Sequence, residues 1–175
     1  MYKRKYTGKG IGVAVLDTGI FPHIDFGRRI LAFCDFTEGK SGPYDDNGHG
    51  THVSGILGGD GTASQGRYKG AAPGCGIVAL KVLDRFGNGS REDVLQAFQW
   101  IEDFGKIYNI RIVNISVGTT SRSMNEQTDL LAGVEQLLHV IHHGLMIAAV
   151  RAYDVHRGHR DVLVQLPHVQ AVEEL

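Results

Sequence analysis

Two side chains in the amino-terminal third of the sequence have the types and surroundings of a proton-transfer pair. Asp17 closes the apolar run VAVL and is followed by a Thr-Gly turn, whereas His49 stands between two glycines in the block DDNGHGTHVSG. We expect His49 in the first turn of a helix, where the positive end of the helix dipole disfavours imidazolium and leaves a neutral ring available as a base. A nearby carboxylate such as Asp17 would stabilise the imidazolium once the proton arrives.

Each of these residues also has a plain structural interpretation. An aspartate at a strand end often caps a turn, and a lone histidine is more often satisfied by local hydrogen bonds than used in catalysis. The functional interpretation therefore depends on whether the fold brings Asp17 and His49 together.

Strand-length apolar runs alternate with helical patterns along most of the chain. Continuous apolar runs such as IGVAVL and IVALKVL are typical of parallel strands buried on both faces. This alternation predicts an α/β fold of three layers, a mainly parallel sheet with helices on both faces. Functional sites of such sheets lie beyond the carboxyl ends of the strands, where Asp17 stands. Strands are predicted over residues 11–16, 29–36, 77–83, 110–117 and 145–150, with a short one at 162–166.

Three helices are expected between these strands. Ser90 to Asp93 reads as a capping box, and residues 123–126 form a second one. The third helix begins near His49, with Val53 and Ile56 on its apolar side. After the first box, apolar residues at helical spacing predict the buried face: Val94, Phe98 and Ile101.

Composition narrows the function classes. With 175 residues the chain has about the length of one domain, and its net charge of −1 gives no basic face for nucleic acid. No stretch approaches the ~20 apolar residues of a membrane span. No secretory leader is recognisable, so a cytoplasmic location is the default expectation. Cys34 and Cys75 form neither a disulfide framework nor a zinc motif and are expected to be free thiols.

Four sequence blocks together resemble the subtilase family of subtilisin-like serine peptidases. VAVLDTGI and DDNGHGTHVSGI resemble its Asp and His blocks, and Asp17 and His49 lie 32 residues apart, the separation that these residues have in subtilisin itself. GAAP at residues 70–73, followed by the strand at 77–83, and NISVG at 114–118 resemble two further segments. The resemblance covers roughly residues 8 to 150 and implies an N-terminal part of a peptidase domain over residues 1–150, with an atypical tail at 151–175.

The resemblance implies a role for each matching residue and a peptide or protein substrate. His49 would be the general base and then the general acid, and Asp17 would orient it. Ser116, Val117 and Gly118 would pair with the substrate backbone as an added strand. Calcium is common in the family, and the loop that begins at Asp60 is a possible place for it, although no other cofactor or metal site is expected.

Two parts of the family pattern are not recognisable in this sequence. A subtilase needs a nucleophilic serine in a block like GTSMA and an oxyanion asparagine in a block like AAGN, yet the last serine is Ser123 and the last asparagine is Asn125. GTTSRSM at 118–124 weakly resembles the serine block. Ser123 is better explained as a helix cap, and neither Ser121 nor Ser123 is expected to be the nucleophile. We therefore expect a serine endopeptidase truncated before its serine and inactive alone; the alternative is a non-catalytic peptide-binding fragment or pseudoprotease.

Other enzyme classes fit the sequence less well. Asp17-Thr-Gly is also the signature of aspartic proteases, but these are all-β and use two such aspartates. GKGIG at 8–12 precedes a strand instead of following one, so it is no dinucleotide loop. A metal site would lack the glutamate of H-E-x-x-H, although five histidines could be considered for it: His49, His52, His139, His142 and His143.

Overall fold

The structure is a computed structural model of the 175-residue chain. It describes residues 6–116, 118–119, 133, 147–148 and 151–152, and every structural statement below concerns these residues.

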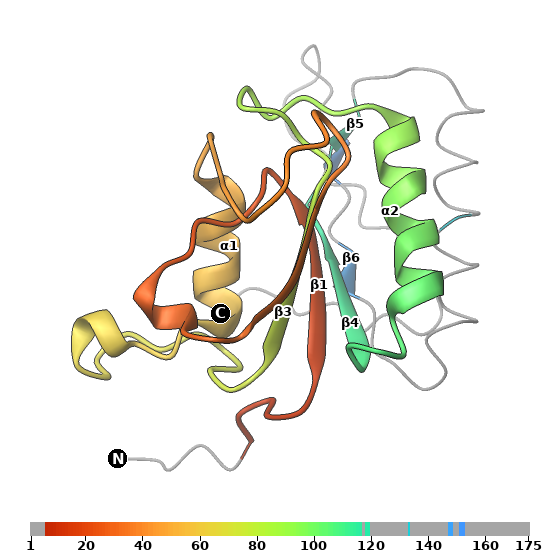
Figure 1. Ribbon diagram of the computed structural model, residues 1–175. Helices are drawn as coiled ribbons and strands as arrows, with labels where there is room; N and C mark the ends of the chain where they lie inside the picture. Colours follow the sequence, from red (N-terminus) through yellow and green to blue (C-terminus); the bar gives the residue numbers. More distant parts are fainter. Residues whose placement is uncertain (1–5, 117, 120–132, 134–146, 149–150, 153–175) are drawn as a thin grey trace.

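A five-stranded parallel sheet forms the middle layer (Figure 1). Its strand order is β2-β3-β1-β4-β6. Strands β2 and β3 therefore lie on one side of the central β1, and β4 and β6 lie on the other. Each residue of β1 is buried, which is why its sequence is apolar without alternation. The predicted strands from 11–16 to 145–150 are present with small shifts at their ends: β1 (Gly12–Asp17), β2 (Ile30–Asp35), β3 (Gly76–Lys81), β4 (Ile110–Ile115) and β6 (Ile147–Ala148).

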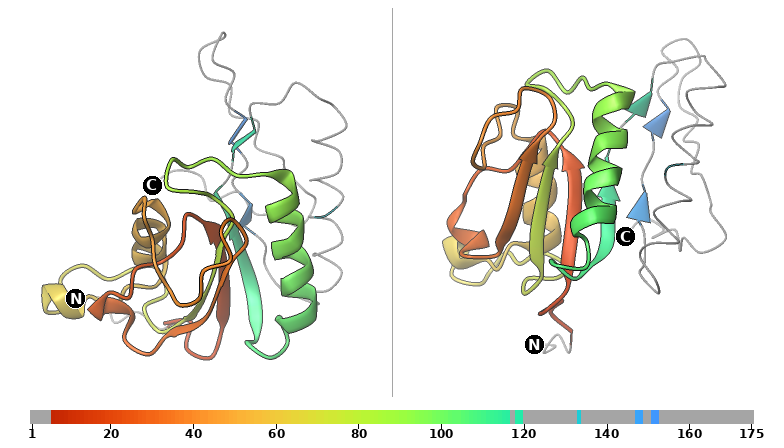
Figure 2. Two further views of the ribbon diagram at one scale, coloured as in Figure 1. Left: turned by 45° about the horizontal axis from the view of Figure 1, so that its top comes forward. Right: turned by 45° about the vertical axis from the view of Figure 1, so that its right-hand side comes forward.

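Within the described part of the chain, a helix covers each face of the sheet, which confirms the predicted three-layer α/β fold. Helix α1 (His49–Gly58) lies on one side and α2 (Arg91–Phe104) on the other (Figures 1 and 2). The apolar side chains of the sheet accordingly divide into two buried clusters. The cluster under α2 includes Leu16, Leu80 and Val113, and that under α1 includes Val13, Val15 and Ile77.

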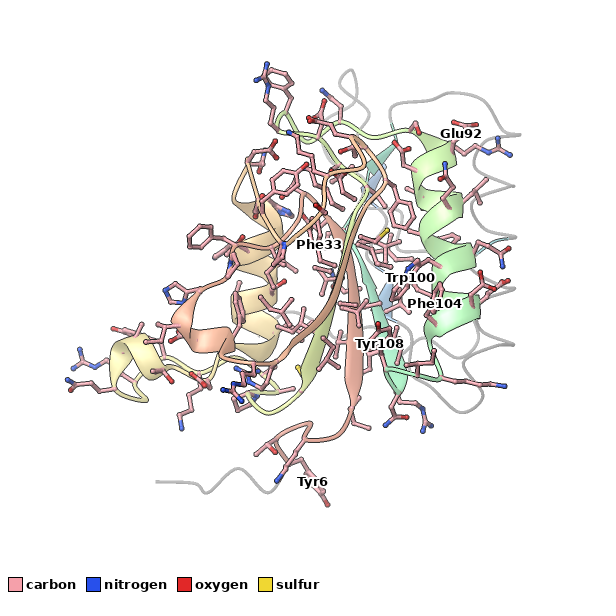
Figure 3. The ribbon with its side chains drawn as sticks, viewed as in Figure 1. Tyr6, Phe33, Glu92, Trp100, Phe104 and Tyr108 are labelled. Atoms are coloured by element: carbon pink, nitrogen blue, oxygen red, sulfur yellow. The ribbon has the colours of Figure 1, made fainter. Side chains whose placement is uncertain are left out.

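Helix α2 begins as its sequence predicts. Ser90 Oγ accepts a hydrogen bond from Asp93 N at 3.1 Å, and Asp93 Oδ2 accepts one from Ser90 N at 3.3 Å, a complete capping box. The expected face, Val94, Phe98 and Ile101, is buried. Trp100 packs against Phe104 and Tyr108 near the end of the helix, with ring centroids 5.0 and 5.6 Å away (Figure 3).

Of the two apolar residues predicted for the packed side of α1, Val53 packs against the sheet and Ile56 does not. Ile56 was expected to be buried but is 61% exposed, and Leu57 packs against the sheet together with the half-buried Val53. The buried side of the helix consists of Gly50, Ser54 and Gly58. Because these residues are small, the helix can lie close to the strands. The apolar spacing alone therefore does not predict which side of the helix is buried.

Several short elements had no sequence signal that we recognised. These are the 3-10 helices η1 (Ile24–Phe26) and η2 (Thr62–Ser64), and a parallel pair formed by β5 (Gly118–Thr119) and β7 (Arg151–Ala152). The helix predicted after Ser123 lies outside the described residues except for Gly133, which is helical, and the strand at 162–166 lies wholly outside them. Within the described part of the chain, no helix is both long and apolar enough to cross a membrane.

Candidate active site

The fold brings Asp17 and His49 into direct contact at the carboxyl end of the sheet. Asp17 is the last residue of β1 and His49 the first of α1. His49 Nδ1 lies 2.8 Å from Asp17 Oδ1 and 2.9 Å from Oδ2, so the expected hydrogen-bonded contact is present. The Asp17 side chain is 1% exposed, whereas that of His49 is 52% exposed. One imidazole nitrogen therefore faces a buried carboxylate while the ring itself remains accessible.

Thr18 fixes the Asp17 carboxylate and joins it to helix α1. The Thr18 backbone N–H donates to Asp17 Oδ1 at 2.7 Å. The Thr18 hydroxyl donates to Asp45 Oδ1 at 2.9 Å and accepts from the Gly50 N–H, also at 2.9 Å. The buried Thr18 thus ties the end of β1 to Asp45 in the turn before α1 and to Gly50 in its first turn.

Asp45 takes the place of a capping side chain at the start of α1. The N-cap residue, Gly48, has φ 99° and no side chain to offer. Asp45 instead accepts hydrogen bonds from Gly48 N at 2.8 Å, from Thr51 N at 2.8 Å and from Thr51 Oγ1 at 2.5 Å. Burial alone would raise the pKa of Asp45, but these bonds outweigh it and hold the pKa below its usual value. An ionised carboxylate at a helix N-terminus is stabilising and keeps this turn in one conformation.

Two glycines permit the close approach of α1 to β1. A Cβ atom on Gly50 would collide with the Gly19 carbonyl oxygen and would lie 3.2 Å from Asp17 Cβ. Gly19 has φ +119°, and a Cβ there would collide with the Tyr44 carbonyl oxygen. Only glycine satisfies both positions, and His49 reaches Asp17 because the helix can lie this close.

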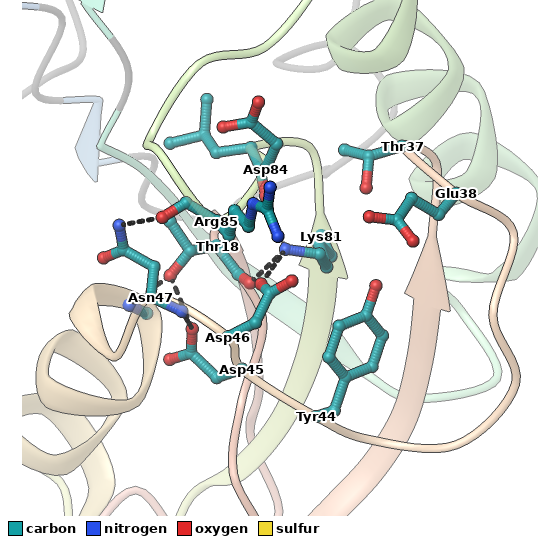
Figure 4. Close-up of polar contacts among 12 residues, drawn as sticks. Thr18, Thr37, Glu38, Tyr44, Asp45, Asp46, Asn47, Lys81, Asp84 and Arg85 are labelled. Atoms are coloured by element: carbon teal, nitrogen blue, oxygen red, sulfur yellow. Dashed lines mark hydrogen bonds and ion pairs between the residues drawn. The ribbon is translucent and has the colours of Figure 1, made fainter.

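A fully buried lysine stands next to this pair. Lys81 is the register partner of Asp17 across β1 and β3, and it is 0% exposed. Its ammonium group donates to the Asp46 carboxylate, as Figure 4 shows. Lys81 is not among the predicted site residues, although a lysine inside an otherwise apolar strand run is a signal that could have identified it.

Of the three residues expected to bind substrate, the structure describes Ser116 and Gly118. Ile115 at the end of β4 is the register partner of Leu16, so Ser116 lies beside the end of β1. Ser116 Oγ accepts a hydrogen bond from Asn114 Nδ2 at 3.0 Å. Gly118 pairs with Arg151 through β5 and β7. Val117 lies outside the described residues, and the substrate-binding role of all three stays a prediction.

Of the five histidines considered for a metal site, the structure describes His49 and His52. His49 Nδ1 contacts Asp17, whereas His52 lines a hollow of about 480 Å³ together with His23 and Tyr68. Among the described residues, no group of three or more His, Cys, Asp or Glu side chains could hold a metal ion. His139, His142 and His143 lie outside the described residues.

The loop at Asp60 does not fit a calcium ion. Asp60 Oδ1 accepts hydrogen bonds from Thr62 N at 2.8 Å and from Thr62 Oγ1 at 2.6 Å. Asp60 Oδ2 lies 3.7 Å from the Arg29 guanidinium, which also donates to the Gly58 carbonyl oxygen. A cationic side chain therefore already stands where a calcium ion would have to approach this carboxylate. The Thr62 hydrogen bonds and the Arg29 charge hold the pKa of Asp60 below its usual value.

Neither the aspartic-protease alternative nor a complete serine triad is supported by the described residues. The parallel α/β sheet contradicts the all-β fold that an aspartic protease requires. No serine in the described part of the chain forms a hydrogen bond with His49; these serines are Ser41, Ser54, Ser64, Ser90 and Ser116. Ser121 and Ser123 lie outside the described residues.

Comparison with known proteins identifies relatives of the chain. Residues 8–153 match the family model of the subtilase family, peptidase family S8. Serine protease AprX of Bacillus subtilis is 41% identical over 135 residues, which cover 74% of this chain and 30% of AprX. Subtilisin Savinase of Lederbergia lenta is 36% identical over 122 residues, which cover 70% of this chain and 42% of Savinase.

A solved structure agrees with these sequence matches. The crystal structure of a cold adapted subtilisin-like serine proteinase superposes with a TM-score of 0.67 at 26% identity, covering 86% of this chain and 49% of that one. The chain thus spans less than half the length of each of these relatives. The family match extends over most of its residues, and the fold agrees with it. The chain belongs to the subtilase family.

Proposed function

We propose that Asp17 and His49 are the general-base pair of a serine endopeptidase that acts on peptides or proteins. The contact of His49 Nδ1 with both carboxylate oxygens of Asp17 is the observation that carries the proposal. Family membership supports the reaction class, because the related proteins are serine proteases by name.

The geometry suits the two proton transfers of peptide-bond hydrolysis. When the Nδ1–H group of His49 donates a hydrogen bond to the Asp17 carboxylate, this bond fixes the tautomer, and the Nε2 lone pair points away from the carboxylate. Since the ring is half exposed, Nε2 is available to take the proton of an attacking hydroxyl. The buried Asp17 carboxylate then stabilises the imidazolium, which returns the proton to the leaving amine.

Ser116, Val117 and Gly118 are proposed to bind the substrate backbone as an added strand. The position of Ser116 beside the end of β1 supports this role, because a peptide paired there would run past the Asp17–His49 contact. A peptide held in this way would have its scissile bond near His49.

The nucleophile is the part of the reaction that the 175 residues do not supply by any recognisable motif. In subtilisin, loss of the nucleophilic serine lowers kcat by about 2 × 10⁶-fold. We therefore propose that this polypeptide, tested alone, binds peptides at most and does not hydrolyse them. Turnover would require a serine block in addition to these 175 residues.

The test is covalent labelling of the purified 175-residue chain with a fluorophosphonate serine reagent, followed by mass spectrometry of the peptides. We expect no adduct and no peptide hydrolysis. An adduct on Ser116, Ser121 or Ser123 that disappears in His49→Ala would show that the chain holds a complete triad. The proposal that it lacks a nucleophile would then be wrong.

A further inference from the structure

Lys81 is a buried charge for which the proposed reaction has no direct use. Its side chain is 0% exposed, and long charged side chains are almost never buried without a partner. Removing an ammonium group from water is costly unless hydrogen bonds and an opposite charge replace the lost hydration. The desolvation cost of the Lys81 ammonium group is accounted for if this group holds neighbouring segments in place.

The ammonium group of Lys81 connects three separate segments at the candidate site (Figure 4). It donates to the Thr18 carbonyl oxygen at 2.8 Å, directly after Asp17. It donates to Asp46 Oδ1 at 2.9 Å, in the turn that leads into His49. Its remaining contact is with the Leu83 carbonyl oxygen at 2.7 Å, where the chain leaves β3. All three ammonium protons are thereby used.

The neighbouring side chains add to this connection. The Lys81 ammonium group lies 5.2 Å from the centroid of the Tyr44 ring, within the range of a cation–π contact. The Tyr44 hydroxyl donates to Asp35 Oδ2 at 2.7 Å. Asn47 Nδ2 donates to the Arg85 carbonyl oxygen at 3.0 Å, so the same turn is also tied to the segment after β3.

We propose that Lys81 and Asp46 are positioning residues for the Asp17–His49 pair. The proposal rests on the proposed function of that pair. Lys81 holds the residue after Asp17 and the turn before His49 against one ammonium group, which sets the distance between the two catalytic side chains. It does not contact substrate and takes no part in proton transfer.

The Lys81–Asp46 ion pair is fully buried on the lysine side and 30% exposed on the aspartate side. Removing one partner leaves a buried charge uncompensated and is strongly destabilising. Replacing both partners by apolar residues of similar size is often neutral or stabilising. The double variant Lys81→Met with Asp46→Leu removes both charges and no longer joins the turn to Thr18. It should fold with lower stability than wild type, because the Thr18 and Leu83 carbonyl oxygens lose a donor. Asp46→Asn, which keeps an acceptor oxygen but loses the charge, is the milder second variant.

The measurement is the tautomer of the His49 ring, read from long-range ¹H–¹⁵N NMR spectra at about pH 8.5, where histidine is ordinarily neutral. In the wild-type chain, the contact with Asp17 favours the Nδ1–H tautomer. We expect the ratio of the Nδ1–H to the Nε2–H tautomer to be at least about tenfold higher for His49 than for exposed His52. The reason is that the His49 hydrogen bond is to a charged group, the Asp17 carboxylate. The matched control is Lys106→Met, an exposed lysine at the other end of the sheet.

We expect the double variant to be folded by circular dichroism, with the His49 tautomer ratio reduced at least about fivefold toward that of His52. Asp46→Asn should shift the ratio in the same direction by a smaller factor, and Lys106→Met should leave it unchanged. A folded double variant or a folded Asp46→Asn variant with the wild-type ratio would overturn the positioning role. A wild-type ratio equal to that of His52 would overturn it as well.

Failure of this inference can be told apart from failure of the proposed function. The tautomer reports only on the contact between His49 and Asp17, with no need for a nucleophile or a substrate. If the wild-type chain shows the Nδ1–H tautomer and the Lys81 variants retain it, the pair stands and only the positioning role is lost.

Discussion

Replacing Asp35 by asparagine should destabilise the fold in a strongly pH-dependent way. Asp35 ends β2, is 7% exposed and closes the loop that leads to the candidate site. Its carboxylate accepts hydrogen bonds from Thr37 N at 2.9 Å, Lys40 N at 3.0 Å and Tyr44 Oη at 2.7 Å, among others. An asparagine at this position keeps one carbonyl oxygen as an acceptor. Its NH₂ group would face backbone N–H and hydroxyl groups that are themselves donors.

The pKa of Asp35 gives the size of the effect. Burial alone would raise it, but the hydrogen bonds from Tyr44, Glu38, Thr37 and Lys40 outweigh burial and lower the pKa from 3.8 to about 2. A difference of this size corresponds to about 2 kcal/mol of unfolding free energy. Because the folded pKa lies below the unfolded one, this contribution is complete above about pH 5 and is lost as the pH falls toward 2.

The assay is urea unfolding of the wild-type and Asp35→Asn chains at pH 7, 4 and about 2.5. We expect the variant to be less stable by about 2 kcal/mol at pH 7, and the difference to shrink steadily at lower pH. Tyr44→Phe is the matched control, since it removes one hydrogen bond and leaves the carboxylate; it should cost about 1 kcal/mol. A difference between wild type and Asp35→Asn that is the same at pH 7 and pH 2.5 would refute the electrostatic explanation.

Further outcomes follow from the packing and from the loop contacts. Gly50→Ala should lower the unfolding free energy by about 1–3 kcal/mol or more, because the added methyl group meets the Gly19 carbonyl; a midpoint within experimental error of wild type would contradict this contact. Ser90→Ala should cost about 1 kcal/mol in thermal unfolding by removing the capping box with Asp93, and an unchanged melting curve would count against it. Millimolar calcium should leave the melting temperature of the chain unchanged, because Arg29 already occupies the approach to Asp60; a clear rise would show that our interpretation of the loop is wrong.

The layers of the fold could be predicted from the sequence because local patterns and tertiary packing agree there. The apolar strand runs of β1 and β3 are buried on both faces, as their composition predicts. Helix α2 has both a capping box and an apolar stripe, so its beginning and its buried face were both predictable. In α1 the apolar spacing of the sequence and the observed packing disagree. Its buried face is made of glycine and serine, and Ile56 is exposed because close approach of the helix, and not apolar area, decides which side faces the sheet.

Of the candidate site, the sequence blocks identified Asp17 and His49 but not the residues that hold them. Thr18 and Asp45 act through hydrogen bonds across 27 residues of sequence, and no local pattern indicates such a contact. Lys81 reaches Asp46 across 35 residues. The helix cap was also hidden, because Gly48 has no side chain and the capping carboxylate belongs to Asp45, three residues earlier.

Activity of a chimera tests the catalytic role of Asp17 and His49 most directly. Residues 1–148, which end with β6, would be joined to the part of AprX that follows the residue equivalent to Ala148, and kcat/KM would be measured on a peptide substrate. We predict hydrolysis that falls about 10⁴- to 10⁶-fold in His49→Ala and about 10⁴-fold in Asp17→Asn. His52→Ala, one turn further along α1, should retain wild-type activity. Hydrolysis that survives His49→Ala, or a folded chimera without hydrolysis, would contradict the assignment of Asp17 and His49 as a general-base pair.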